Sequence, residues 1–202
     1  MVWFRLTPWL ASSRLIYLQT VRVIVIEVES KYWSPGNEKV VKALVRLGAK
    51  RIAEDTIEDV YFEHPGKDFG KTDEALRLRK KGDTAELNYK GPRMKGDRVK
   101  AREEIGLKVD NALTAQRIVE RLGFKEFCTV RKMRVSYELD KIRIDIDTVE
   151  GLGEFVELEI LTESPEQSLQ LFDTAIKELS LEKLEPKTYL EMILEGQASS
   201  KG

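Results

Sequence analysis

Charged and apolar residues alternate in the segment 23–32, which reads VIVIEVESKY. Glu27, Glu29 and Lys31 stand at every second position, with Val28 and Ser30 between them. Because residues two apart in a strand point to the same face, the segment predicts a strand with one apolar and one charged face. Taken alone, such a strand is either a solvated surface strand or the wall of a polar cavity.

Further segments along the chain alternate in the same way. We predict additional strands at 60–63, 74–81, 84–90, 98–107, 128–139, 141–148 and 154–162. Surface strands usually expose a mixture of Thr, Ser, Gln and Lys, whereas most polar positions here are Glu, Asp, Arg or Lys. In chain order, the charged faces carry Arg77, Arg79, Glu86, Lys90, Lys100, Arg102, Glu104, Lys132, Arg134, Glu138, Lys141, Arg143, Asp145, Asp147, Glu157 and Glu159.

Segments with apolar residues at helical spacing separate some of these strands. We predict helices over about 34–50, from Asp110 to Gly123, from Ser164 onward, and over 187–194. The apolar stripe of the second helix consists of Ala115, Ile118, Val119 and Leu122. If the helices cover the outside of a sheet that curls round, the charged faces must line its interior, and closing the sheet also removes its edges. The pattern therefore predicts a tunnel lined by acids and bases.

The composition excludes several classes of protein. The chain of 202 residues has 34 Lys and Arg against 35 Asp and Glu, so we expect neither a nucleic-acid partner nor a membrane partner. Cys128 and His64 are the single residues of their kinds, which excludes an internal disulfide and a Cys/His metal cluster. A lone cysteine is typical of a cytoplasmic protein.

The first residues of the chain differ from the rest. Residues 1–20 contain no acid and no uninterrupted apolar run of signal-peptide or membrane-spanning type. We interpret 1–20 as an N-terminal extension, or as the product of a start codon assigned too early. We expect residues 21–196 to form the barrel domain and 197–202 to form a flexible tail.

A tunnel that carries both signs of charge requires a ligand that compensates both. Buried unpaired charges cost several kcal/mol each, so they persist only when something neutralises them. A polyphosphate with a divalent metal meets this need, because Arg and Lys bind phosphate oxygens and carboxylates bind Mg²⁺ or Mn²⁺. Neither GxxxxGK[ST] nor GxGxxG occurs in the chain, so side chains must hold the phosphates.

The motif EVESK at 27–31 resembles the ExExK signature of the CYTH superfamily, the triphosphate tunnel metalloenzymes. ALRLRK, YKGP, AREE, RKMR and DIDTVEGLGEFVELE follow in the family's order, and the resemblance covers about 23–194. It implies an α+β fold in which helices surround an eight-stranded antiparallel β-barrel. The segments DVYFEHPGKDF and EPKTYLEMI are most similar to the class IV adenylate cyclase-like branch. Class IV cyclases carry a His-Phe pair ahead of ExExK, and this chain has apolar residues there.

The resemblance also implies a set of site residues. As ligands of Mg²⁺ or Mn²⁺ it gives Glu27, Glu29, Asp145, Glu157 and Glu159. Glu104 and Asp147 stand on the same charged faces of their strands, and we expect them to assist. As residues that hold the triphosphate it gives Lys31, Arg77, Arg79, Lys90, Arg102, Lys132 and Arg134. Lys31, Glu27 and Glu29 are the candidates for the catalytic proton transfer.

The resemblance predicts a metal-dependent enzyme that converts ATP to cyclic AMP and pyrophosphate. Two alternatives stay open. One is hydrolysis of the terminal phosphate of thiamine triphosphate or inorganic tripolyphosphate, and the other is a non-catalytic module that binds polyphosphate or nucleotide. In each case the partner is a small-molecule triphosphate, and a homodimer is a further expectation.

Overall fold

The computed structural model describes residues 26–93, 100–162 and 165–199, without the side chains of residues 26–27, 100–101, 162, 165–169 and 199. The expected extension 1–20 and residues 200–202 lie outside this description, whereas 197–199 belong to the last helix. No helix of the described ranges is both long enough and apolar enough to cross a membrane.

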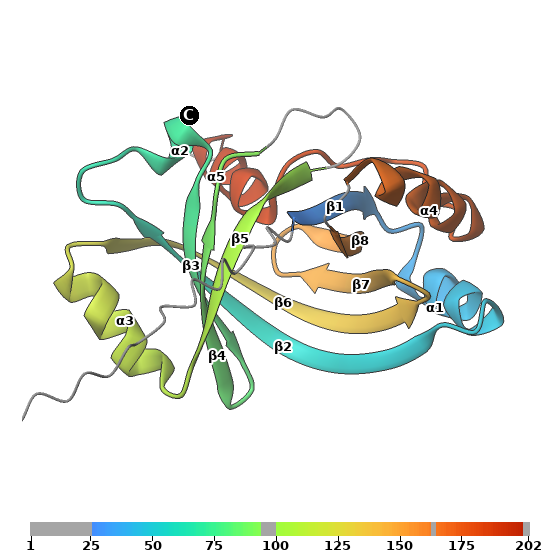
Figure 1. Cartoon of the computed structure of the whole chain (residues 1–202), viewed down its shortest axis with the longest axis horizontal. Coiled ribbons are helices and arrows are strands. Elements are labelled where there is room, and N and C mark those ends of the chain that lie inside the picture. The colour runs from blue at the N-terminus through green and yellow to red at the C-terminus, as the bar shows by residue number, and fades with distance from the viewer. Residues whose placement is uncertain (1–25, 94–99, 163–164, 200–202) are drawn as a thin grey trace, which may run out of the picture.

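Eight antiparallel strands of the described chain form a closed barrel, as the sequence predicts (Figure 1). Around the barrel the strands follow the order β1-β5-β4-β3-β2-β6-β7-β8, and β8 pairs with β1. The bounds are β1 (Ile26–Trp33), β2 (Lys50–Glu63), β3 (Ala75–Lys81), β4 (Thr84–Lys90), β5 (Lys100–Val109), β6 (Lys125–Leu139), β7 (Ile142–Val149) and β8 (Gly153–Thr162).

The register of the strands brings charged residues together inside the barrel. On β1 and β8, Lys31 is opposite Glu157 and Glu29 is opposite Glu159. Because residues two apart along a strand share a face, these two pairs lie next to each other on the interior face of the barrel. The alternation seen in the sequence is therefore an alternation between the inside and the outside of the barrel.

Helices cover the apolar outer faces of the strands. The five helices of the described ranges are α1 (Asn37–Arg46), α2 (Phe69–Thr72), α3 (Ala112–Arg121), α4 (Pro165–Glu178) and α5 (Tyr189–Ser199). Leu44 of α1 and Phe172 of α4 pack with Val28, Ile144 and Leu158 in one buried cluster. Because burial of apolar surface stabilises by about 25 cal/mol per Å², this outer core holds the barrel closed around a polar interior.

A second buried cluster joins α3 to strands β2, β3 and β4. Ala115 and Val119 of α3 are buried there, but Ile118 and Leu122 are 57% and 68% exposed. The predicted apolar stripe of this helix is therefore wrong for half of its members. Only Ala115 and Val119 of that stripe face the strands, and Ile118 and Leu122 face outward.

The structure also differs from the sequence prediction in β2. This strand begins at Lys50, ten residues before the predicted start at Val60. Residues 50–59 read KRIAEDTIED and lack a continuous apolar face. They adopt the extended conformation because β6 pairs with β2 from Lys50 onward, and β3 joins on the other side from Ile57.

Candidate active site

A cavity of about 680 Å³ opens at one end of the barrel. The antiparallel registers place the ends of β1, β2 and β4 together with the beginnings of β3, β5, β6 and β8 at this end. All of the predicted triphosphate-binding residues line the cavity: Lys31, Arg77, Arg79, Lys90, Arg102, Lys132 and Arg134. The structure thus brings seven cationic side chains from five strands to one place.

The predicted metal ligands separate into two groups. Glu29, Glu157 and Glu159 line the cavity. Asp145 and Asp147 are at most 1% exposed and lie among basic side chains of the barrel wall instead. The backbone of Glu27 belongs to β1, where it faces Arg102 of β5, but its side chain lies outside the described residues.

Arg134 is the centre of the most deeply buried ionic network in the described residues. Its Nε donates to Asp147 Oδ1 at 2.6 Å, and its terminal nitrogens donate to Asp145, Asp147 and Glu157. Lys132 Nζ donates to Asp147 Oδ2 at 3.0 Å. Burial by itself would lower the pKa of Arg134, but the surrounding carboxylates raise that pKa well above its ordinary value. The two aspartates therefore hold Arg134 charged and fixed at the wall of the cavity.

Asp59 of β2 is the buried counterion of two other basic residues, Arg77 and Arg79. Its side chain is almost fully buried and accepts two hydrogen bonds from Arg79, each of 2.7 Å, and it lies 3.6 Å from Arg77. Burial would raise the pKa of Asp59, but the charges of Arg77 and Arg79 outweigh it and hold the pKa well below its usual range. The sequence analysis missed Asp59 because it lies in the part of β2 that was not predicted. The sequence signal that could have found Asp59 is its spacing from Tyr61, because residues two apart in a strand point to the same face.

Tyr189 of α5 connects the C-terminal helix to the site. The ring centroid lies 3.9 Å from Lys31 Nζ and 4.8 Å from Lys132 Nζ, and the hydroxyl donates to Asp147 Oδ2 at 2.9 Å. Cation–π contacts of this kind stabilise by about 0.5–2 kcal/mol, more where water is excluded. Sequence reasoning placed a helix here but assigned Tyr189 no role.

On the opposite wall, β3, β4 and β5 supply a third group of ionic residues. Glu104 accepts a hydrogen bond of 2.6 Å from Lys90 Nζ and lies 3.5 Å from Arg77. Arg102 is 6% exposed, and its buried Nε finds no hydrogen-bond partner among the described residues. A buried guanidinium donor without an acceptor is costly, and a phosphate oxygen is the acceptor that Arg binds best.

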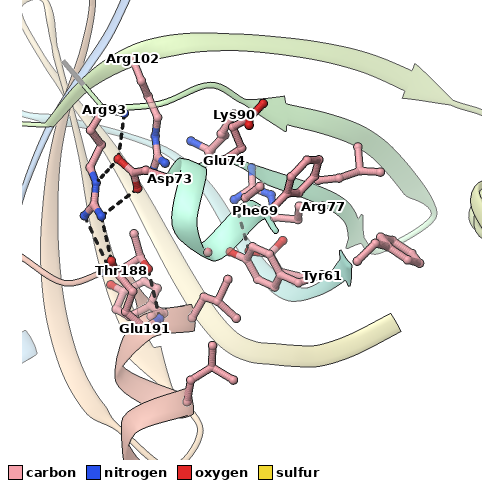
Figure 2. A pocket seen from close by; sticks show the side chains of 18 of the residues that line it. Tyr61, Phe69, Asp73, Glu74, Arg77, Lys90, Arg93, Arg102, Thr188 and Glu191 are labelled. Carbon is pink, nitrogen blue, oxygen red and sulfur yellow. Dashed lines mark hydrogen bonds and ion pairs between the residues drawn. The ribbon is translucent and has the colours of Figure 1, made fainter. Parts of the chain in front are cut away.

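The mouth of the cavity lies between α2 and α5 (Figure 2). Arg93, which follows β4, donates to Asp73 Oδ2 from its backbone N and its Nε, at 2.9 and 2.8 Å. The same guanidinium donates to Glu191 Oε1 of α5 at 2.8 Å. These bonds tie the two helices together beside the opening.

The carboxylates of β1 and β8 suit a divalent cation. Glu29 and Glu159 stand directly opposite each other and both line the cavity. Like charges in that position repel, and a hard cation between them removes the repulsion. No cluster of three candidate ligands occurs among the described side chains, which do not include Glu27. Metal binding by this pair stays a prediction, as does the assignment of Asp145, Asp147 and Glu104 as ligands.

Comparison with known proteins agrees with the geometry. A candidate adenylate cyclase of Methanocaldococcus jannaschii is 43% identical over 136 residues, which cover 67% of this chain and 77% of that protein. Adenylate cyclase CyaB of Aeromonas hydrophila is 29% identical over 171 residues, covering 81% of this chain and 86% of the relative. The solved structure of the PH1819 protein from Pyrococcus horikoshii OT3 is 34% identical and superposes with a TM-score of 0.76, over 84% of this chain and 99% of that one. The CYTH domain family model matches residues 25–192, and the chain therefore belongs to the CYTH family.

Proposed function

We propose that this protein is a metal-dependent enzyme that acts on triphosphates, and that its reaction is of the class IV adenylate cyclase type. The observation that carries the proposal is the convergence of seven Lys and Arg side chains on one cavity that also holds paired carboxylates. The names of the two relatives, a candidate adenylate cyclase and an adenylate cyclase, support the choice of reaction.

The basic residues supply binding and charge neutralisation. Arg77, Arg79 and Arg134 are oriented by Asp59, Asp145 and Asp147, so their positions are set before a substrate arrives. Preorganised donors of this kind stabilise the charge that develops on phosphate oxygens in the transition state. Lys31 is held by the ring of Tyr189 and lies 4.0 Å from Glu157, so its ammonium can stabilise the departing phosphates.

We place the divalent cation, Mg²⁺ or Mn²⁺, at Glu29 and Glu159, with Glu27 and Glu157 as further carboxylates. When bound, such a cation polarises a phosphate oxygen and lowers the charge that the side chains must neutralise. In the cyclase reaction the ribose 3′-hydroxyl of ATP attacks the α-phosphorus, loses its proton and displaces pyrophosphate. The candidate proton acceptors are the carboxylates of Glu27 and Glu29, and Nζ of Lys31 in its neutral amine form, in which it does not neutralise phosphate charge.

Hydrolysis of the terminal phosphate is the second candidate reaction. In it, water attacks the γ-phosphorus and the same cations bind the phosphate chain. The observation that favours it is the apolar sequence ahead of EVESK, where class IV cyclases carry a His-Phe pair.

Product analysis with purified protein tests the proposal. ATP, thiamine triphosphate and tripolyphosphate are each supplied with Mg²⁺ and with Mn²⁺, and cyclic AMP, pyrophosphate and orthophosphate are resolved. Cyclic AMP with pyrophosphate supports the cyclase. Orthophosphate without cyclic AMP, accompanied by ADP from ATP, thiamine diphosphate from thiamine triphosphate or pyrophosphate from tripolyphosphate, supports the triphosphatase. Binding of these compounds without any product would overturn the enzyme proposal and leave a binding module.

A pair of variants makes the test specific to the site. Glu29→Ala removes a carboxylate from the cavity, and we expect a folded protein without metal-dependent turnover. Glu103→Ala, an exposed acid next to Arg102 on β5, is the control and keeps its activity. Equal activity in both variants would contradict the assigned site.

A further inference from the structure

Asn88 of β4 is a buried polar residue in the charged interior of the barrel. It is 3% exposed, and it is not one of the residues that line the cavity. In the registers of β3, β4 and β5 it stands directly between Arg77 and Gly106. Arg77 does line the cavity and is labelled in Figure 2. Any effect of Asn88 on a ligand must therefore pass through a neighbouring side chain.

The neighbour that Asn88 contacts is Arg77. Nη2 of Arg77 donates a hydrogen bond of 3.3 Å to Oδ1 of Asn88. The same nitrogen lies 3.5 Å from Oε1 of Glu104, and Nη1 lies 3.6 Å from Oδ2 of Asp59. An amide oxygen accepts from a guanidinium as a carboxylate oxygen does, but it adds no negative charge. Asn88 therefore restricts the orientation of Arg77 without neutralising it.

Gly106 of β5 provides the space for the amide of Asn88. A Cβ atom at Gly106 would lie 3.0 Å from Nδ2 of Asn88 and would collide with Oε1 of Glu86. The backbone does not require a glycine here, because Gly106 is not among the residues with positive φ. Glycine weakens the interior of a strand and often marks a place where another group approaches the backbone closely. The side chains that approach at this place are those of Asn88 and Glu86.

The neutrality of the amide matters because two acids already lie near Arg77. Asp59 also accepts two hydrogen bonds from Arg79. Glu104 also accepts one from Lys90. Each of these carboxylates is therefore shared with a second cation. A third carboxylate in place of the amide would pair with Arg77 itself, and a phosphate oxygen would have to compete with it.

We propose that Asn88 is a positioning residue for the phosphate-binding site. It holds Arg77 at the cavity wall as a neutral acceptor, in the space that Gly106 leaves, and so keeps the charge of Arg77 available to the substrate. This inference rests on the proposed function, in which Arg77 binds the phosphates, and it adds a residue that lies outside the cavity.

The test measures the dissociation constant of tripolyphosphate by calorimetry in the presence of Mg²⁺. Asn88→Asp keeps the shape of the side chain and adds a charge beside Arg77, whereas Asn88→Leu removes the acceptor without adding a charge. Asn111→Asp is the matched control, because it makes the same change of charge at the exposed N-cap of α3. Asp caps a helix about as well as Asn does. Asn88→Leu is also made in an Arg77→Met background.

We expect Asn88→Asp to bind tripolyphosphate about tenfold more weakly than the wild type, because its carboxylate competes with phosphate for Arg77. Asn88→Leu should bind about fivefold more weakly, because Arg77 loses the acceptor that orients it. In the Arg77→Met background, Asn88→Leu should change the affinity less than about twofold, since its effect passes through Arg77. A side chain that only supports the fold would weaken binding equally in both backgrounds.

Two results would overturn the inference and leave the proposed function standing. One is an Asn88→Asp protein that binds tripolyphosphate as tightly as Asn111→Asp does. The other is an equal loss of affinity from Asn88→Leu with and without Arg77, and this comparison decides alone if Asn88→Asp does not fold. A wild-type protein that binds no tripolyphosphate would overturn the inference and the proposed function together.

Discussion

The substitution Asp59→Asn tests the idea that buried acids hold the phosphate-binding arginines in place. Asp59 is 2% exposed and accepts both hydrogen bonds of a bidentate pair with Arg79. Asn keeps the shape of the side chain but removes the charge and one of the two acceptors. Arg77 and Arg79 then lie near each other without the anion that separates their charges.

The structure sets the expected size of the effect. Removing one partner of a buried ion pair destabilises by about 3–5 kcal/mol. The side chains of Arg79 and Arg77 are 21% and 9% exposed, so water screens part of the repulsion. We therefore expect a loss of about 2–3 kcal/mol, which for a chain of this size lowers the melting temperature by roughly 4–12 °C.

Differential scanning calorimetry measures this change, and Glu58→Gln provides the matched control. Glu58 is the preceding residue of β2 and pairs with Lys80 and Arg131 at 2.9 and 3.0 Å on the outer face. Exposed pairs of this kind contribute about 0–1 kcal/mol. Tripolyphosphate should raise the melting temperature more in Asp59→Asn than in the wild type, because its oxygens replace the lost anion.

The dependence on pH gives a further check. The pKa of Asp59 is lowered by folding, so its stabilising effect is fully present above the unfolded pKa of about 3.9 and is lost as the pH falls through the folded pKa. The stability difference between wild type and Asp59→Asn should therefore be constant near neutral pH and narrow below about pH 4. If Asp59→Asn melts like Glu58→Gln at neutral pH, or tripolyphosphate stabilises it no more than the wild type, the proposed role of Asp59 is wrong.

Three other substitutions probe separate parts of the site. Tyr189→Phe removes the donor to Asp147 but keeps the ring, and we expect a loss of about 1 kcal/mol in chemical denaturation; no loss would mean that this bond is not formed. Glu159→Gln should weaken Mn²⁺ binding at least tenfold in calorimetric titration without lowering stability, because it removes one of two facing carboxylates; unchanged affinity would place the metal elsewhere. Arg93→Met should speed amide hydrogen exchange in α5 and lower the free energy of unfolding by about 1 kcal/mol, because the partly exposed ion pairs of Arg93 with Asp73 and Glu191 anchor that helix. Unchanged exchange would show that these ion pairs do not hold α5.

The sequence was sufficient to predict the barrel because its strands, apart from residues 50–59 of β2, obey one constraint. An interior of ionic side chains and an exterior covered by helices force charged and apolar residues to alternate, as in Arg143, Ile144 and Asp145 of β7. The alternation fails in residues 50–59 of β2, where much of the outer face is in water and apolar residues are not required. Because the predicted strand began only at residue 60, Asp59 was not recognised as a residue of the barrel interior.

The mouth of the cavity could not be predicted for a different reason. Helix α2 has four residues, too few to show a helical period. Leu190 and Leu194 stand four apart on α5, a spacing that indicates one buried face and does not reveal that a cavity lies beneath it. Which side chains share a pocket depends on strand register and on the position of the terminal helix, and neither can be derived from local pattern.

The charged interior assigns two roles to acids that look alike in the sequence. Asp59, Asp145 and Asp147 are buried and bonded to guanidinium groups, so they act as fixed counterions. Glu29 and Glu159 face each other across β1 and β8 and line the cavity, so a cation from outside the protein can reach them. A barrel built only of the first kind would be a neutral, rigid core, and one built only of the second would repel itself. Their combination keeps the arginines charged and oriented in a buried place while Glu29 and Glu159 remain at the cavity, where we propose that the metal binds.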